Sequence, residues 1–93
     1  MAVARHLVIH GRVQGVFYRA WTVETARELG LAGWVRNCRD GTVEALVQGD
    51  EDVVGRFVEL AQDGPPWARV ERVEATAVQP EAGLAGFAQR PTA

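Results

Sequence analysis

The chain has 93 residues, which is enough for one small domain and too few for two. Hydrophobic residues make up 47% of the chain and charged residues 24%, so a globular protein is expected rather than a disordered one. The formal net charge of −2 argues against a general nucleic-acid binder, because such domains are usually basic.

The first half of the chain predicts a strand, a loop and a helix. The apolar run over residues 5–10 is typical of a short strand, and Gly11 closes it. The loop Gly11–Arg19 follows. A helix is predicted from about Ala20 to Leu29, with Gly30 in the position of a left-handed C-terminal cap.

The middle of the chain predicts a hairpin. Two strands are expected over residues 33–38 and 42–48, and Asp40-Gly41 between them is a strong hairpin signal. Three alternating apolar residues of the second strand share one face. They are Val43, Ala45 and Val47.

A second helix is predicted after the hairpin. Asp50 fits its N-cap and two further acids fit its first turn. Apolar residues at helical spacing form one stripe, and Gly64-Pro65-Pro66 ends the helix. The stripe consists of Val53, Val54, Phe57, Val58 and Ala61.

The last part of the chain predicts one clear strand, over residues 68–78. Val70 and Val73 have opposite parity on it, so we expect a bulge or a twist between them. Beyond Pro80 only Leu84 and Phe87 can anchor a possible fifth edge strand.

The predicted order is β-α-β-β-α-β, the arrangement of ferredoxin-like α+β folds. Such a fold is a two-layer sandwich with both helices on one face of an antiparallel sheet. We expect residues 1–93 to form this single domain. The fold alone hosts many unrelated activities, so function must come from a site.

The distribution of charge and the number of cysteines limit where a functional site can lie and of what kind it can be. Residues 1–45 carry six arginines against four acids, while residues 46–93 carry four against eight, so an anion site is expected in the first half. Cys38 is the one cysteine, which excludes an internal disulfide and a thiolate zinc site. No apolar run approaches the roughly 20 residues that cross a bilayer, and nothing resembles a signal peptide. A cytoplasmic protein is therefore expected.

The loop Gly11–Arg19 has the features of an anion cradle. Its glycines allow a tight turn whose successive N–H groups converge on one oxyanion. The following helix N-terminus adds about half a positive charge, and the fork of Arg19 donors fits phosphate. The alternative is an ordinary strand-to-helix connection. The glycine spacing matches neither the Walker loop nor the dinucleotide fingerprint.

Asn37 is the second candidate. It lies near the end of a predicted strand, where asparagine is depleted, so its side chain has either a functional role or a hydrogen bond to local backbone.

Two segments together strongly resemble the acylphosphatases. The resemblance continues through Ala68-Arg69-Val70 and covers roughly the first four-fifths of the chain, whereas the tail over residues 86–93 departs from the family pattern. The two segments read Gly11-x-Val13-Gln14-Gly15-Val16-x-x-Arg19 and Gly33-Trp34-Val35-x-Asn37-x-x-Asp40-Gly41-x-Val43-Glu44.

This resemblance implies metal-independent hydrolysis of acyl phosphates to a carboxylate and inorganic phosphate, with no cofactor. It implies that Arg19 binds the phosphate and that Asn37 orients the attacking water. Inorganic phosphate or sulfate is the expected site ligand. The residues whose backbone forms the cradle are then Gln14, Gly15, Val16, Phe17, Tyr18 and Arg19.

Two other functions remain open at this stage. One is a non-catalytic anion-binding module. The presence of Asn37 argues against it, because anion binding alone does not need this residue. The other is an RNA-binding domain of similar topology, which requires exposed aromatics and a basic sheet face. We expect a monomer whose partner is a small acyl phosphate, with no nucleic-acid or membrane partner.

The other conspicuous residues have structural interpretations. His6 and His10 share parity, but without a third ligand nearby in sequence they are expected to be polar surface or helix-facing positions. Cys38 is expected to be a half-buried thiol rather than a nucleophile. The larger aromatic residues are expected in the core or lining the site. They are Phe17, Tyr18, Trp21, Trp34 and Trp67.

Overall fold

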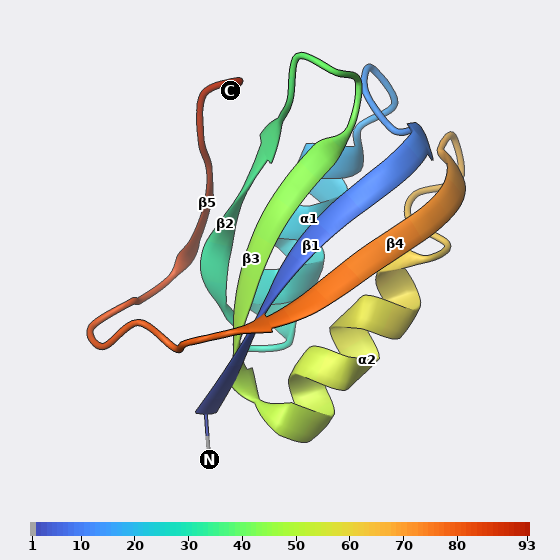
Figure 1. The fold of residues 1–93 in the computed structure, drawn as a ribbon. Helices are drawn as coiled ribbons and strands as arrows, with labels where there is room; N and C mark the ends of the chain where they lie inside the picture. The colour runs from blue at the N-terminus through green and yellow to red at the C-terminus, as the bar shows by residue number, and fades with distance from the viewer. Residues whose placement is uncertain (1) are drawn as a thin grey trace.

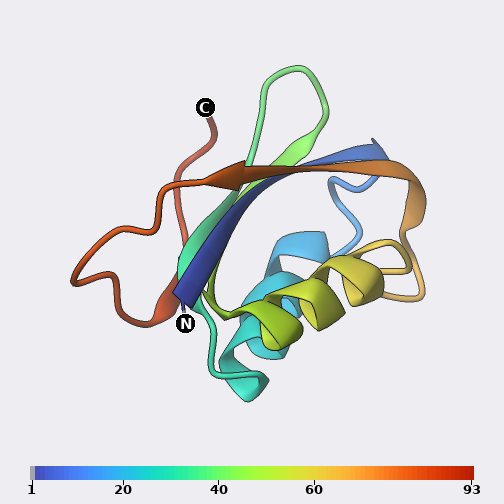
Figure 2. The same cartoon turned by 60° about the horizontal axis from the view of Figure 1, so that its bottom comes forward.

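A computed structural model describes residues 2–93. Its strands form one sheet in the order β4-β1-β3-β2-β5 (Figure 1), and both helices cover the same face of it (Figure 2). This confirms the ferredoxin-like two-layer sandwich. The elements are β1 (Ala2–Arg12), α1 (Tyr18–Glu28), β2 (Ala32–Asn37), β3 (Val43–Asp50), α2 (Glu51–Ala61), β4 (Arg69–Val78) and β5 (Phe87–Gln89).

The fifth strand corrects one expectation. β5 pairs with β2 in parallel, with Gly33 opposite Phe87 and Val35 opposite Gln89, so the sheet is mixed and not purely antiparallel. The reason is the path of the chain, which crosses the end of the sheet from β4 to the far edge and then runs beside β2 in the same direction (Figure 1). Phe87 is buried and Leu84 half-buried, as expected of the two anchors.

The predicted irregularity in β4 is a bulge. His10 lies opposite Arg72 and Gly11 opposite Val70, so Glu71 has no partner in β1. Gly11 has a φ of 125°, and a Cβ there would lie 2.1 Å from the carbonyl oxygen of Arg69. Only glycine fits this close approach. The bulge therefore resets the register just before β1 ends and just after β4 begins.

The core lies between the sheet and the helices. The predicted face of β3 is fully buried there, and so is the centre of the α2 stripe. The helix-facing residues of β1 complete the layer, since residues on one face of a strand alternate. The buried residues of these three elements are Leu7, Ile9, Val43, Ala45, Val47, Val54, Phe57 and Ala61.

Helix α1 begins two residues earlier than predicted, at Tyr18. Its buried positions are Tyr18, Thr22 and Ala26, whereas Ala20 is exposed. The Tyr18 hydroxyl donates a hydrogen bond to the Ala61 carbonyl oxygen at 2.7 Å, and burial raises the pKa of this phenol. Gly30 has a φ of 72°, which confirms the left-handed cap. The earlier start places Arg19 inside the first turn. Neither helix in the described part of the chain has the length and apolar character that crossing a membrane requires.

Candidate active site

The loop between β1 and α1 carries two residues with left-handed backbone. Gly15 has a φ of 73° and Phe17 a φ of 67°, with Val16 between them at negative φ. Phe17 is the one non-glycine residue with positive φ among residues 2–93, a conformation that costs on the order of 1 kcal/mol. Alternating backbone handedness turns successive N–H groups toward a common point, which is the geometry of an anion-binding turn.

The N-terminus of α1 is open. Phe17 occupies the N-cap position, and no side chain there accepts a hydrogen bond from the first N–H groups. The first turn contains no acidic residue, and Arg19 adds a positive charge. The positive end of the helix dipole is therefore not neutralised by residues of the turn itself.

A cavity of about 260 Å³ lies at this helix end. It brings Arg19 of α1 and Asn37 of β2 into one lining, as the sequence predicted. Gln89 of β5 also lines it, which the sequence did not indicate because the parallel pairing of β5 was not foreseen. The lining residues are Val13, Gly15, Phe17, Tyr18, Arg19, Ala20, Asn37 and Gln89.

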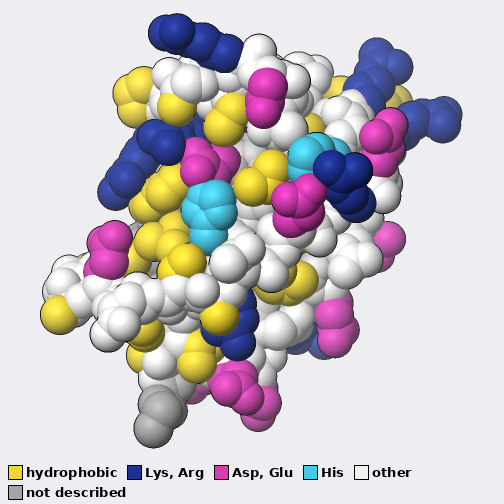
Figure 3. Space-filling view, in the orientation of Figure 1, with side chains coloured by type: hydrophobic (Ala, Val, Ile, Leu, Met, Phe, Trp, Pro, Cys, Tyr) yellow, Lys and Arg dark blue, Asp and Glu magenta, His cyan; other side chains and the backbone are white. Residues whose placement is uncertain are grey.

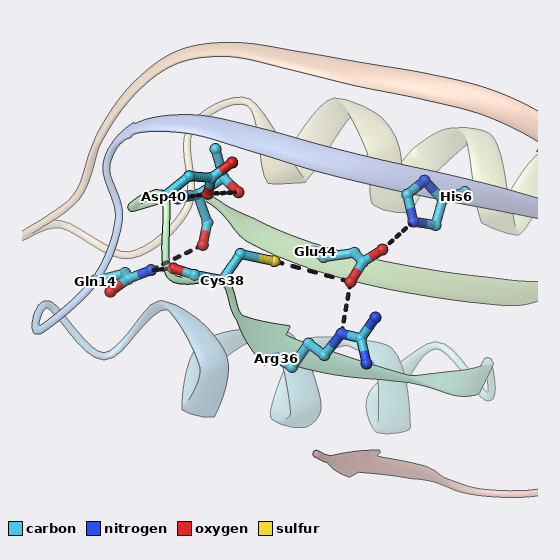
Figure 4. Close-up of polar contacts among 7 residues, drawn as sticks. His6, Gln14, Arg36, Cys38, Asp40 and Glu44 are labelled. Atoms are coloured by element: carbon cyan, nitrogen blue, oxygen red, sulfur yellow. Dashed lines mark hydrogen bonds and ion pairs between the residues drawn. The ribbon is translucent and has the colours of Figure 1, made fainter. Parts of the chain in front are cut away.

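Gln14 is not among the residues that line this cavity. Its side chain fastens the loop to the β2–β3 hairpin (Figure 4). Its Nε2 donates hydrogen bonds to the carbonyl oxygens of Cys38 at 2.7 Å and Thr42 at 2.9 Å. Val16 is buried in the core. Of the six predicted cradle residues, Gln14 and Val16 therefore do not line the cavity.

The hairpin turn is held by Asp40. Its Oδ1 accepts hydrogen bonds from the Thr42 hydroxyl at 2.6 Å and the Thr42 N–H at 3.0 Å (Figure 4). These bonds lower the pKa of Asp40 below its ordinary value. The turn that follows Asn37 is thus fixed by local hydrogen bonds as well as by Gln14.

Asn37 is the last residue of β2. Its backbone carbonyl accepts a hydrogen bond from the Ala93 N–H at 3.0 Å, and Arg39 N–H donates to the Ala93 carbonyl at 2.9 Å. Its side-chain Oδ1 is buried and has no hydrogen-bond partner among residues 2–93. The alternative of a bond to local backbone is thus not observed for this oxygen. Leaving a buried acceptor unpaired costs about 1–3 kcal/mol, so this oxygen is an exception to the pairing of buried polar groups.

The opposite face of the sheet carries a charged cluster that is separate from the cavity (Figures 3 and 4). Glu44 accepts a hydrogen bond from Arg36 Nε at 2.5 Å and lies 2.6 Å from His6 Nε2. Burial alone raises the pKa of Glu44, but the bonds to His6 and Arg36 outweigh it and hold this pKa below its ordinary value. The Cys38 thiol is half-buried and directed toward Glu44 at 3.8 Å. This cluster links β1, β2 and β3.

The second histidine lies on the same face. His10 Nε2 is 3.1 Å from Glu74 Oε1, an ion-pair distance without hydrogen-bond alignment. Both histidines therefore face away from the helices, each beside a glutamate (Figure 3). Within residues 2–93 there is no group of three or more His, Cys, Asp or Glu side chains placed to hold a metal ion.

The aromatic residues divide between core and surface. Trp21 packs against Tyr18 and Phe57, and Trp34 is buried beneath the guanidinium groups of Arg36 and Arg90 at 4.8 and 4.7 Å. A larger hollow of about 770 Å³ beside Trp34 contains none of the predicted site residues. Trp67 was expected either in the core or lining the site. It does not lie in the core, since 72% of it is exposed.

Comparison with known proteins identifies the family of the chain. A family model described as Acylphosphatase matches residues 5–89. A curated acylphosphatase of Acidovorax sp. (strain JS42) is 54% identical, over 98% of this chain and 93% of its own. One from Thermococcus kodakarensis is 53% identical, over 91% and 92%. The crystal structure of acylphosphatase from Bacillus subtilis superposes with a TM-score of 0.91 at 34% identity, over 95% of this chain and 98% of that one. The chain therefore belongs to the acylphosphatase family, and its activity is the hydrolysis of acyl phosphates.

Proposed function

We propose that the phosphoryl group of an acyl phosphate binds at the N-terminus of α1. It is held by the Arg19 guanidinium and by the backbone of Gly15 and Phe17–Arg19, the part of the predicted Gln14–Arg19 cradle that lines the cavity, while Asn37 orients the attacking water. One observation carries this proposal. Arg19 and Asn37, from different elements, line the same cavity as the left-handed turn at an uncapped helix end. The unpaired Oδ1 of Asn37 supports the second role.

The chemistry requires little beyond these groups. An acyl phosphate is a mixed anhydride whose leaving group is a carboxylate, so the leaving oxygen needs no protonation. Phosphoryl transfer chiefly needs positioning and stabilisation of charge on the equatorial oxygens. The N–H groups and Arg19 supply that charge stabilisation.

Asn37 supplies the positioning. A water that donates a hydrogen bond to Asn37 Oδ1 is held in line with the breaking bond. Its oxygen bonds to phosphorus as the bond from phosphorus to the acyl oxygen breaks. The water proton passes to a phosphoryl oxygen, and the products are a carboxylate and inorganic phosphate.

The proposal also covers the cofactors, site ligands, oligomeric state and location of the protein. The site works without a metal or cofactor, and inorganic phosphate or sulfate occupies the cradle in competition with substrate. Residues 1–93 act as one domain, a cytoplasmic monomer whose partner is a small acyl phosphate rather than a nucleic acid. The lone, half-buried Cys38 and the negative net charge support this assignment.

Release of phosphate from benzoyl phosphate by the purified protein tests the proposal. Activity should survive dialysis against a chelator, and inorganic phosphate should inhibit competitively, because the cradle recognises the tetrahedral anion. Activity that vanishes with the chelator and returns with Mg²⁺ or Zn²⁺ contradicts the metal-free mechanism. Kinetics unaffected by millimolar phosphate contradict the placement of the anion in this loop.

A further inference from the structure

A second hollow, of about 440 Å³, lies beside the phosphoryl cavity. The two share Gly15 and Phe17 in their linings. A molecule whose phosphoryl group lies in the cradle can therefore extend past Phe17 into this second space. Its lining residues are Arg12, Gly15, Val16, Phe17, Pro66, Trp67, Ala68 and Arg69.

Two exposed aromatic side chains border this hollow. Phe17 is 73% exposed and Trp67 72%, whereas the other large rings of the described chain are buried or half-buried. Exposed aromatic rings beside a binding cavity offer apolar surface that becomes buried only when a ligand covers it. Phe17 is also the residue with the left-handed backbone described above. The two rings can therefore cover the faces of a flat apolar group.

Two arginines give the hollow its charge. Arg12 and Arg69 lie directly opposite one another across β1 and β4, on the far side of the bulge at Glu71. Like charges directly opposite on neighbouring strands destabilise a sheet. No acidic group among residues 2–93 forms an ion pair with either guanidinium. In a chain of net charge −2, this is a pair of positive charges without a partner.

We propose that this hollow is the subsite for the acyl group. It selects acyl phosphates whose acyl group is flat and apolar next to the anhydride and carries a second anionic group, such as a carboxylate, at its far end. Phe17 and Trp67 contact the flat part, and Arg12 with Arg69 binds the distal anion. The proposal rests on the placement of the phosphoryl group in the Gln14–Arg19 cradle.

Three substrates test the subsite. They are 4-carboxybenzoyl phosphate, benzoyl phosphate and acetyl phosphate, which is too short to reach the hollow. The protein should show a kcat/KM about fivefold higher for the carboxylated substrate than for benzoyl phosphate, as expected of an anion near exposed arginines. This preference should shrink in high salt, because exposed charges are screened.

Variants of the lining residues test which side chains cause the preference for the carboxylated substrate. The double variant R12Q/R69Q should bring the two aroyl phosphates to equal kcat/KM while hydrolysis of acetyl phosphate stays within about twofold. Arg69→Glu should reverse the preference. Trp67→Ala should lower kcat/KM for benzoyl phosphate about threefold and leave acetyl phosphate unchanged. Arg56→Gln, at an exposed position of α2, is the matched control and should change none of these values.

The outcomes are distinct. Equal kcat/KM for both aroyl phosphates in the wild-type protein, or a preference that persists in a folded R12Q/R69Q protein, overturns the subsite and leaves the phosphoryl site intact. If the wild-type protein hydrolyses none of the three substrates, the placement of the phosphoryl group is overturned, and the subsite with it. Circular dichroism of each variant establishes that it is folded.

Discussion

The two helices of this molecule begin in opposite ways. Helix α2 follows β3 directly, with Asp50 in extended conformation at its N-cap and Glu51 and Asp52 in its first turn. Helix α1 has a left-handed Phe17 at the same position, no acid in its first turn, and Arg19. Each helix has eleven residues and packs on the same sheet face. Acidic side chains neutralise the positive end of the α2 dipole, whereas no acid of the first turn does so for α1, as the proposed anion site requires.

Removing Arg19 should have the largest effect, because in the proposed mechanism it contacts phosphate in both the ground state and the transition state. Arg19→Ala should lower kcat/KM by about 10³-fold or more and weaken phosphate binding. Arg19→Lys should remain badly impaired, since an ammonium keeps the charge and loses the fork. Steady-state kinetics with calorimetric phosphate titration measure this, and Arg56→Ala is the control. Phosphate affinity unchanged in a folded Arg19→Ala protein would contradict the role.

Asn37→Ala should separate turnover from binding. In the proposed mechanism the Asn37 side chain contacts the water only as the water attacks, so kcat should fall about 10²–10³-fold while phosphate affinity changes little. The same two measurements distinguish this from Arg19, whose loss affects both. Normal turnover in a folded variant would show that Asn37 does not position the water, and would favour a non-catalytic anion-binding module.

Ala20→Glu gives α1 the acidic first turn that α2 has. Ala20 is exposed and lines the phosphoryl cavity, so the new carboxylate should weaken phosphate binding about fivefold. The same charge should slightly stabilise the helix, so binding and stability should change in opposite directions. Phosphate titration and urea denaturation test this against Ala20→Gln. If phosphate binds equally to both variants, the helix end is not the anion site.

Asp52→Asn makes the converse change in α2 and should have the smallest effect. The free energy of unfolding should fall by about 0.3–1 kcal/mol at low salt, because the dipole loses a complementary charge. Phosphate affinity should not change. Glu59→Gln, near the other end of the same helix, should not destabilise the protein. Urea denaturation at low and high salt measures both, and loss of phosphate binding in Asp52→Asn would refute the division of roles between the helices.

Local patterns were enough to predict much of this fold. Three short-range signals were informative. They are the alternation of Val43, Ala45 and Val47, the Asp40-Gly41 turn, and the parity change between Val70 and Val73, which left a bulge or a twist as the choices. Local pattern alone left alternatives open for Arg19 and Asn37, and the two motifs of the acylphosphatase resemblance singled them out. One cavity is lined by both residues.

The features that the sequence did not reveal depend on distant parts of the chain. The parallel pairing of β5 follows from the path of residues 79–86 across the sheet, and a three-residue strand has no periodicity of its own. The left-handed backbone of Phe17 is unexpected in an aromatic residue, and it sets the earlier start of α1. Gln89 reaches the cavity only through that pairing. The Gln14 side chain bonds acceptors that the tertiary fold alone brings within reach.

Gln14 also determines how the two halves of the site keep their separation. Arg19 follows β1 and Asn37 ends β2, and these strands are not neighbours, because β3 lies between them. Without a direct link, the distance between Arg19 and Asn37 would depend on the backbone hydrogen bonds from β1 to β3 and from β3 to β2. It would then change whenever the twist of the sheet changes. The Gln14 side-chain amide donates hydrogen bonds to the carbonyls of Cys38 and Thr42, on the two sides of the β2–β3 turn, and so links the β1–α1 loop directly to this hairpin. Displacements of about 1 Å cost on the order of 10²-fold in rate. The proposed mechanism therefore depends on the Gln14 link to hold the Arg19 guanidinium and the Asn37 amide at a fixed separation.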